Sequence, residues 1–144
     1  MENLHEVRWG ILGCGDVCEV KSGPAFNKVP NSKLIGVMRR DRDKVIDFAK
    51  RHHVPKYFTD ANDLINDPEI NAIYIATPPA NHEAYAIMCM KAGKPVYIEK
   101  PVTLNSASCE KILQTSRALN VKASVAHYRR GLPFFQKIRS LISS

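Results

Sequence analysis

The sequence predicts an α/β protein built on a doubly wound parallel sheet with helices on both faces. Two observations predict it: short apolar segments alternate regularly with segments of helical period, and a glycine-rich turn follows the first apolar segment. We expect six strands in the order 3-2-1-4-5-6, joined by right-handed crossovers. The 144 residues suffice for one domain with its own core, so residues 1–144 are expected to form a single unit.

Six short, mostly apolar segments are expected to form the strands. Near-continuous apolar runs of this length are typical of strands that are buried on both faces of a parallel sheet. In chain order the expected strands are residues 7–12, 33–38, 56–58, 72–76, 95–98 and 121–126, of which the third is the weakest.

The segments between these strands carry apolar residues at helical spacing. Asp60 followed by Asp63 predicts the start of a short helix, and Gly93 before Pro95 predicts a helix end. Apolar residues within 132–144 predict one more helix at the end of the chain. The helix faces expected to be buried are Val45, Phe48, Ala49 and His52; Tyr85, Met88, Cys89 and Ala92; and Cys109, Ile112, Leu113 and Leu119.

The distribution of charge argues against binding to nucleic acid. The chain carries 21 Lys and Arg against 14 Asp and Glu, a net charge of +7, but its basic clusters are short. They lie at residues 39–42, 50–51 and 129–130, and no expected helix carries a long basic stripe. Short clusters favour a local anionic ligand such as a phosphate, so we expect no nucleic-acid partner.

Hydropathy and cysteine usage favour a cytoplasmic protein. No apolar run approaches the roughly 20 residues needed to cross a membrane, so no membrane partner is expected. The polar, acidic start at residues 1–6 does not resemble a secretory signal. The cysteines form no CxxC pair, which predicts free thiols and no metal site. They are Cys14, Cys18, Cys89 and Cys109.

The glycine-rich turn at residues 13–18 has the context of a dinucleotide-binding fingerprint, because a strand precedes it and a helix is expected after it. Gly13 permits the tight turn, and Gly15 lets the backbone approach a pyrophosphate at the start of the helix. Cys18 replaces the third glycine, a position that serves packing. A plain glycine turn is the alternative. The candidate cofactor contacts here are Gly13, Cys14, Gly15, Asp16 and Val17.

Two arginines follow the expected second strand. A protein that prefers NAD usually has an acidic residue there, about 20 residues beyond the glycines, which binds the ribose 2′-hydroxyl. Arg39 occupies that position and Arg40 follows it. Guanidinium groups suit a 2′-phosphate, so the pair favours NADP over NAD. Alternatively, the two side chains are only the solvated end of a strand.

Three further segments follow strands at the edge where open α/β sheets bind ligands. Thr77 offers a hydroxyl in the loop 76–82, which its prolines stiffen. Lys100 follows the fifth strand and precedes a proline, so it is held extended and projects a cation into the same crevice. Residues 127–130 follow the sixth strand, and either contact a ligand or cap the fold.

In this order and spacing, the glycine turn, Ala-Thr-Pro-Pro-x-x-His and Glu-Lys-Pro resemble the glucose-fructose oxidoreductase / inositol dehydrogenase / rhizopine catabolism (Gfo/Idh/MocA) family. The resemblance covers nearly the whole chain but only the first half of such a protein. It implies a Rossmann domain that binds NAD or NADP, and hydride transfer to or from a sugar, a polyol or a related compound. The second domain, which in the family supplies a catalytic Asp and His, is absent from residues 1–144.

The resemblance also implies roles for individual residues. Lys100 would contact substrate near the nicotinamide and assist proton transfer, with Glu99 supporting it, and the Lys100–Pro101 peptide is expected to be cis. Without a second domain this constellation is incomplete, so the fragment is expected to be inactive alone. The implied contacts on the ribose and nicotinamide side of the cofactor are Thr77, Pro78, Pro79 and His82.

Two rival functions stay open at this point. A non-catalytic module would use the dinucleotide as a sensor ligand or bind a partner, and a basic domain would bind nucleic acid. Titration with NADPH distinguishes the two, because the dinucleotide-binding module would bind it tightly and the nucleic-acid-binding domain would not. Apolar area on the sheet or the terminal helix also predicts a homo-oligomer.

Overall fold

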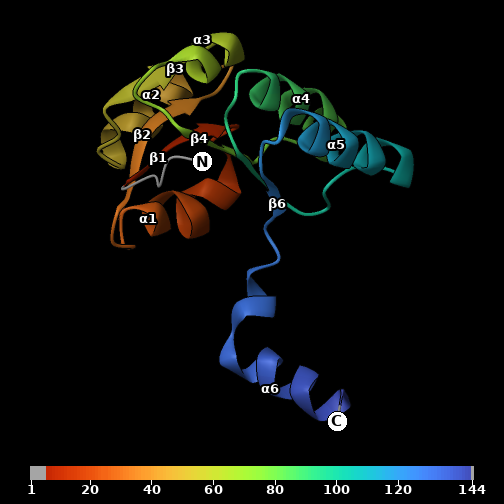
Figure 1. Ribbon diagram of the computed structural model, residues 1–144. Helices are drawn as coiled ribbons and strands as arrows, with labels where there is room; N and C mark the ends of the chain where they lie inside the picture. Colours follow the sequence, from red (N-terminus) through yellow and green to blue (C-terminus); the bar gives the residue numbers. More distant parts are fainter. Residues whose placement is uncertain (1–5, 144) are drawn as a thin grey trace.

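Six parallel strands form the central sheet of the computed structural model, which describes residues 6–143 apart from the side chains of Lys21 and Pro24 (Figure 1). The order β3-β2-β1-β4-β5-β6 confirms the predicted topology. The strands are β1 (Val7–Leu12), β2 (Ser32–Met38), β3 (Lys56–Phe58), β4 (Ala72–Ile75), β5 (Val96–Ile98) and β6 (Ala123–Val125). The polar start at residues 1–5, and Ser144, lie outside the described residues.

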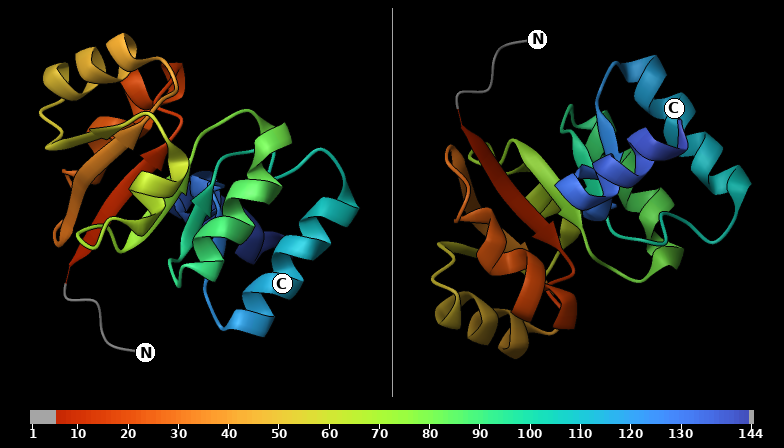
Figure 2. Two further views of the ribbon diagram at one scale, coloured as in Figure 1. Left: turned by 90° about the horizontal axis from the view of Figure 1, so that it is seen from above. Right: turned by 90° about the horizontal axis from the view of Figure 1, so that it is seen from below.

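Helices cover both faces of the sheet, as predicted (Figure 2). They are α1 (Gly23–Phe26), α2 (Arg42–Arg51), α3 (Ala61–Asn66), α4 (His82–Lys91), α5 (Ser106–Leu119) and α6 (Pro133–Ile142). Successive side chains of a strand point to opposite faces, so the sheet has two cores. Ile11 packs with the α2 residues Val45 and Phe48 on one face. Leu12 packs on the other face, among residues of α3, α4 and α5.

The last strand is shorter and more exposed than predicted. Residues 121–126 were expected to form a buried strand, but β6 comprises only Ala123–Val125, and Ala123 and Ser124 are exposed. The reason is its position at the edge, where it pairs only with β5 among the described strands. The prediction that every strand is buried on both faces is therefore wrong for β6, and also for β3 at the other edge, where Tyr57 is exposed.

The helix ends agree with their sequence signals. Asp60 is the N-cap of α3 and accepts a hydrogen bond from the backbone N–H of Asn62 at 2.7 Å. Gly93 follows α4 with φ of 74°, the left-handed conformation that ends a helix. In α2, the predicted residues Val45, Phe48 and Ala49 are buried.

The predicted face is partly right for α4 and largely wrong for α5. Of the residues predicted for α4, Cys89 is buried, Tyr85 and Met88 are half-buried against the core, and Ala92, directly after the helix, is exposed. This helix is apolar around most of its circumference, so its periodicity does not indicate which face is buried. In α5, Ile112 alone of the predicted set is buried, because α5 packs mainly against α4 as an outer layer and less against β6 of the sheet. The buried residues of α4 are His82, Ala86, Cys89 and Met90.

The segment after the glycine turn is not the regular helix that the fingerprint predicts. It forms a π-helical turn over Cys18–Ser22, in which the N–H of Gly23 bonds to the carbonyl of Cys18, and then the short α1. Pro24 follows directly and has no N–H to donate, which favours this irregular geometry.

The chain ends in the predicted terminal helix, α6, which projects away from the rest of the molecule (Figure 1). Within residues 6–143, no helix combines the length and the apolar character that crossing a bilayer requires.

Candidate functional site

The carboxyl ends of the strands meet at one edge of the sheet, where two cavities adjoin. The arginine cavity has a volume of about 330 Å³ and the lysine cavity about 500 Å³, and both are lined by Ala76 and Thr77. The arginine cavity is also lined by Gly13, Cys14, Gly15, Met38, Arg39, Arg40, Pro78, Asn81 and Tyr85. The lysine cavity is also lined by Val17, Glu99, Lys100, Ala126, His127, Tyr128 and Arg129.

The two glycines of the turn have different surroundings. Gly13 has φ of 89°, and a Cβ there would lie 2.8 Å from Cγ2 and 2.9 Å from the backbone nitrogen of Thr77. Only glycine therefore lets the turn pack against the loop after β4. At Gly15 a Cβ would meet nothing within 4 Å, so this backbone is open to a ligand. The turn also spans both cavities, since Gly13 and Gly15 line one and Val17 lines the other.

The cysteines of the turn are packing residues. Cys14 and Cys18 are fully buried, and burial raises the pKa of Cys14 to about 11 and that of Cys18 to about 12. Both thiols therefore stay protonated at neutral pH and do not act as nucleophiles. Cys18 belongs to the core between the sheet and α2, which is the packing role expected of the third glycine.

Arg39 directly follows β2, and its side chain contacts the glycine turn. Its backbone N–H donates to the carbonyl of Phe58 at 3.1 Å, and its Nη1 donates to the carbonyl of Cys14 at 3.3 Å. Arg39 is half-buried and Arg40 is exposed. Within residues 6–143 neither arginine forms an ion pair, although Arg39 interacts electrostatically with Asp41 outside the cavity. The cavity beside the glycine turn is therefore lined by two cations and by no carboxylate.

The loop after β4 holds one unsatisfied hydroxyl and one buried histidine. Oγ1 of Thr77 is buried and has no hydrogen-bond partner in the described part of the chain. His82 is 1% exposed, with Nε2 2.6 Å from the carbonyl oxygen of Thr77 and Nδ1 3.1 Å from that of Val102. His82 therefore joins two loops behind the cavities and lines neither of them.

Glu99 is held by both of its carboxylate oxygens. Oε1 accepts a hydrogen bond from the hydroxyl of Tyr74 at 2.6 Å, and Oε2 accepts one from the backbone N–H of Lys100 at 3.0 Å. The Tyr74 hydroxyl also lies 2.8 Å from Oγ of Ser22. Burial, followed by the bond to Glu99, raises the pKa of Tyr74 well above its usual value, so the phenol remains a donor. The Lys100–Pro101 peptide is cis, as expected.

Most of the candidate residues come together, but three do not. Asp16 is exposed, Pro79 is half-buried and His82 is buried, and none of the three lines either cavity. For His82 the cause is the orientation of α4, which turns its first residue into the core.

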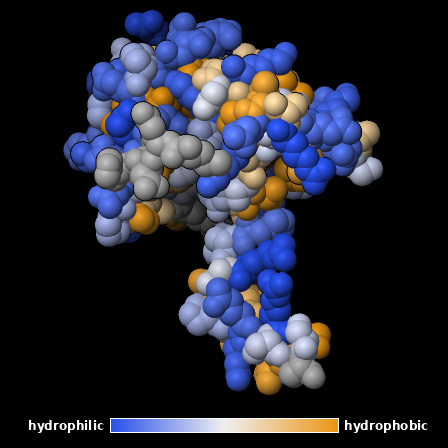
Figure 3. All heavy atoms as spheres, in the orientation of Figure 1, coloured by the Kyte–Doolittle hydropathy of each residue, from blue (hydrophilic) through white to orange (hydrophobic). Residues whose placement is uncertain are grey.

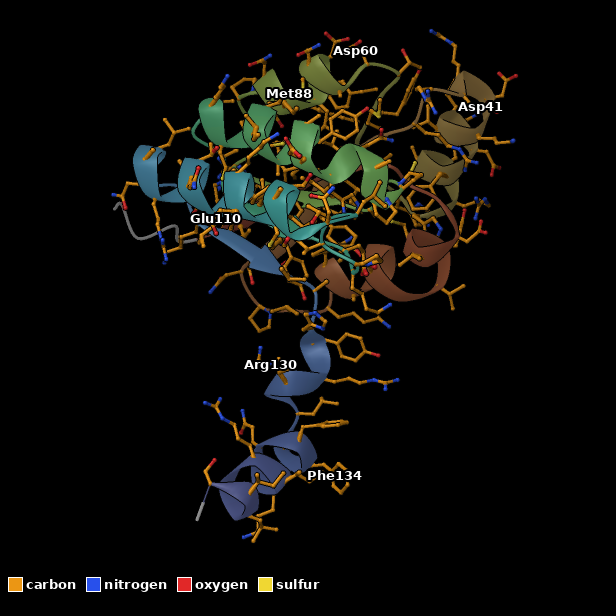
Figure 4. All side chains as sticks on the ribbon, turned by 90° about the vertical axis from the view of Figure 1, so that its right-hand side faces the viewer. Asp41, Asp60, Met88, Glu110, Arg130 and Phe134 are labelled. Atoms are coloured by element: carbon orange, nitrogen blue, oxygen red, sulfur yellow. The ribbon has the colours of Figure 1, made fainter. Side chains whose placement is uncertain are left out.

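Sequence reasoning missed several residues that the structure brings to the site. Tyr74 was expected only as part of a buried strand, although a hydroxyl there needs a partner. For residues 127–130 the sequence left two alternatives open, a ligand contact or a cap of the fold. Residues 127–129 line the lysine cavity, whereas Arg130 does not and lies on the turn that leads to α6 (Figure 4). The other lining residues not predicted as contacts are Met38, Ala76, Asn81, Tyr85 and Ala126.

Comparison with known proteins agrees with this geometry. The sequence model of the Gfo/Idh/MocA family, described as an oxidoreductase family with an NAD-binding Rossmann fold, matches residues 7–127. The chain belongs to this family. As a Gfo/Idh/MocA chain it carries the family's nucleotide-binding domain, which confirms the resemblance seen in the sequence.

Its relatives are oxidoreductases of greater length. Oxidoreductase P35 of Formosa agariphila is 53% identical over 138 residues, which are 96% of this chain and 43% of the relative. Trans-1,2-dihydrobenzene-1,2-diol dehydrogenase of Xenopus tropicalis is 30% identical over 94% of this chain and 42% of the relative. The chain thus spans about two fifths of the length of these relatives.

Solved structures share the fold at lower identity. A probable dehydrogenase from Thermotoga maritima superposes with a TM-score of 0.87 at 23% identity, over 95% of this chain and 41% of that one. The 3-ketoreductase KijD10 of Actinomadura kijaniata, solved with NADP and TDP-benzene, superposes with a TM-score of 0.88 at 20% identity. This superposition covers 96% of the present chain and 42% of the KijD10 chain.

The residues present fit the dinucleotide that the family implies. The open backbone at Gly15 leaves room for a pyrophosphate, and Thr77, whose buried hydroxyl has no partner within the described residues, lines both cavities.

Proposed function

We propose that this chain binds NADP in preference to NAD, with the dinucleotide lying across both cavities. In this arrangement the ribose 2′-phosphate lies in the arginine cavity and the nicotinamide in the lysine cavity. The observation that carries the proposal is the pair of cations, Arg39 and Arg40, in a cavity that is lined by no carboxylate and lies directly beside the turn that contains Gly13 and Gly15. A 2′-phosphate supplies the negative charge that this cavity lacks.

In the whole protein, we propose hydride transfer to or from a sugar, a polyol or a related alcohol or carbonyl compound. When bound, the nicotinamide would supply the hydride chemistry. Lys100 would hydrogen-bond the reacting hydroxyl or carbonyl oxygen and move its proton. Glu99 would act as a positioning residue rather than an acid or base, because both of its oxygens are already hydrogen-bonded.

The preference for NADP is tested by calorimetric titration with NADPH and NADH. One charge-assisted hydrogen bond contributes roughly 1.5–3 kcal/mol, so the chain is expected to bind NADPH at least about tenfold more tightly. Arg39→Asp should weaken the binding of NADPH and leave the binding of NADH unchanged or tighter. The reason is that a carboxylate repels the 2′-phosphate but accepts a hydrogen bond from a free ribose hydroxyl. Arg40→Ala should have a smaller effect.

Arg130→Gln is the control, since this arginine lies outside both cavities and should leave both affinities unchanged. The wild-type preference should also fall with added salt, because the site is partly exposed. Equal affinities of the unmodified chain for the two cofactors would mean that Arg39 and Arg40 are only a solvated strand end.

A further inference from the structure

The lysine cavity carries more positive than negative charge. Lys100 and Arg129 both line it, and within residues 6–143 neither forms an ion pair. The carboxylate in the lining is Glu99, whose two oxygens are taken by Tyr74 and by the backbone N–H of Lys100. One cation in this cavity therefore lacks a counter-ion within the described chain.

The fold holds the two cations at neighbouring strand ends. Lys100 follows β5 and Arg129 follows β6, and the two strands pair in register, with Ile98 opposite Val125. The N–H of Ala126 donates to the carbonyl of Ile98 at 2.8 Å, which continues the pairing to the cavity. The turn that carries Arg129 is a 3₁₀ helix over Tyr128–Gly131, closed by a bond from the N–H of Leu132 to the carbonyl of Arg129 at 3.1 Å.

The cofactor does not account for Arg129. In the proposed binding mode, the pyrophosphate lies at the glycine turn and the 2′-phosphate in the arginine cavity, which Arg129 does not line. Thus both phosphate-bearing parts of NADP have partners elsewhere. The lysine cavity has about 500 Å³, a size typical of a small-molecule site.

We infer that the substrate carries a carboxylate: it is a sugar acid or a similar hydroxy acid whose carboxylate binds Arg129 while its reacting hydroxyl reaches Lys100. This inference rests on the proposed function, since it assumes that NADP fills the remaining space. A guanidinium binds a carboxylate through two parallel hydrogen bonds, which fixes the orientation of the substrate as well as its charge. Arg129 is thereby a specificity-determining residue.

The test compares D-glucuronate with its neutral analogue D-glucuronamide, by calorimetry in the presence of saturating NADPH. Glucuronate is expected to bind about tenfold or more tightly than the amide, and added salt should reduce the difference. Arg129→Gln should remove the preference without changing the affinity for NADPH. Arg130→Gln removes the same charge from a residue outside the cavity and should keep the preference.

Several outcomes would overturn the inference: equal binding of the two sugars, no binding of either, or tighter binding of glucose 6-phosphate than of glucuronate. A parallel loss of NADPH affinity in Arg129→Gln would assign this residue to the cofactor instead. Failure of the unmodified chain to bind NADPH would contradict the proposed function, whereas tight NADPH binding without a preference for glucuronate would contradict only the inference about Arg129.

Discussion

Gly13 and Gly15 lie two residues apart in one turn, yet the structure gives them different reasons to be glycine. Gly13 is required by the protein itself, because a side chain there would collide with Thr77 and the backbone is left-handed. A Cβ at Gly15 would meet no protein atom within 4 Å, so any requirement for glycine there comes from a ligand. The two positions therefore separate a folding role from a binding role within a single motif.

We predict that Gly15→Ala changes the free energy of unfolding by less than about 0.5 kcal/mol but lowers NADPH affinity at least about tenfold. The added methyl group occupies space that the pyrophosphate needs. Gly13→Ala should instead lower the free energy of unfolding by about 1–3 kcal/mol, because of the strained φ and the contact with Thr77. Urea denaturation and calorimetry measure the two quantities, and wild-type NADPH affinity in Gly15→Ala would refute a pyrophosphate at this turn.

At the level of elements, a polar cluster ties the irregular helical segment after the glycine turn to α2. Both carboxylate oxygens of Glu19 accept hydrogen bonds at 2.7 Å from Arg51, and Oε2 also lies 2.8 Å from Nε2 of His52. The His52 ring packs on Phe48, with centroids 4.3 Å apart. The cluster holds the segment that presents the glycine turn to the cavities.

This cluster predicts a pH-dependent contribution to stability. Hydrogen bonds, chiefly from Arg51, lower the pKa of Glu19 from its usual 4.5 to about 2. A carboxylate with a lowered pKa in the folded state stabilises the protein above its unfolded pKa, and that stabilisation is lost as the pH falls from about 4.5 to 2. Because Glu19 and Arg51 are partly exposed, their interaction contributes only about 1 kcal/mol to the free energy of unfolding at neutral pH.

Glu19→Gln should therefore lower the free energy of unfolding by about 1 kcal/mol at pH 7 and flatten its decline between about pH 5 and 2. Urea denaturation across this pH range measures both effects. Glu110→Gln, which neutralises an exposed carboxylate on α5, should change neither. An unchanged pH profile in Glu19→Gln would show that the cluster does not stabilise the fold.

For the molecule as a whole, α6 is the element least supported by its surroundings. It projects from the body, and hydrophobic residues lie exposed among the polar ones on its surface (Figure 3). Phe134 is 70% exposed, Leu141 62% and Ile142 80%. Exposed apolar area of this kind is typical of surfaces that another protein surface covers.

We propose that the chain associates with itself through α6. Sedimentation velocity should show a mass above that of the monomer that grows with concentration. Replacing Phe134 and Leu141 together by Gln should shift the equilibrium toward monomer, whereas Lys137→Gln on the same helix should not. A clean monomer at high concentration in the unmodified chain would contradict self-association.

The order of the strands, the glycine turn, the helix caps and the ligand edge of the sheet could all be predicted from the sequence. Each depends on a local signal: apolar runs that alternate with helical period, Gly13 at a position that needs positive φ, and Asp60 at a helix start. Arg39 and Lys100 were placed at the same edge because parallel strands all end there. These features follow from short stretches of chain and from the rules that join them.

Only the tertiary structure decided which of these residues face the cavities. The sequence did not reveal that His82 turns into the core or that Tyr74 holds Glu99, and it did not decide whether Arg129 contacts a ligand or caps the fold. The physical reason is the same in each case. Periodicity predicts that a helix has a buried face, but it does not identify that face when the helix is apolar all round. Hydrogen bonds between residues far apart in the sequence depend on packing that no local pattern records.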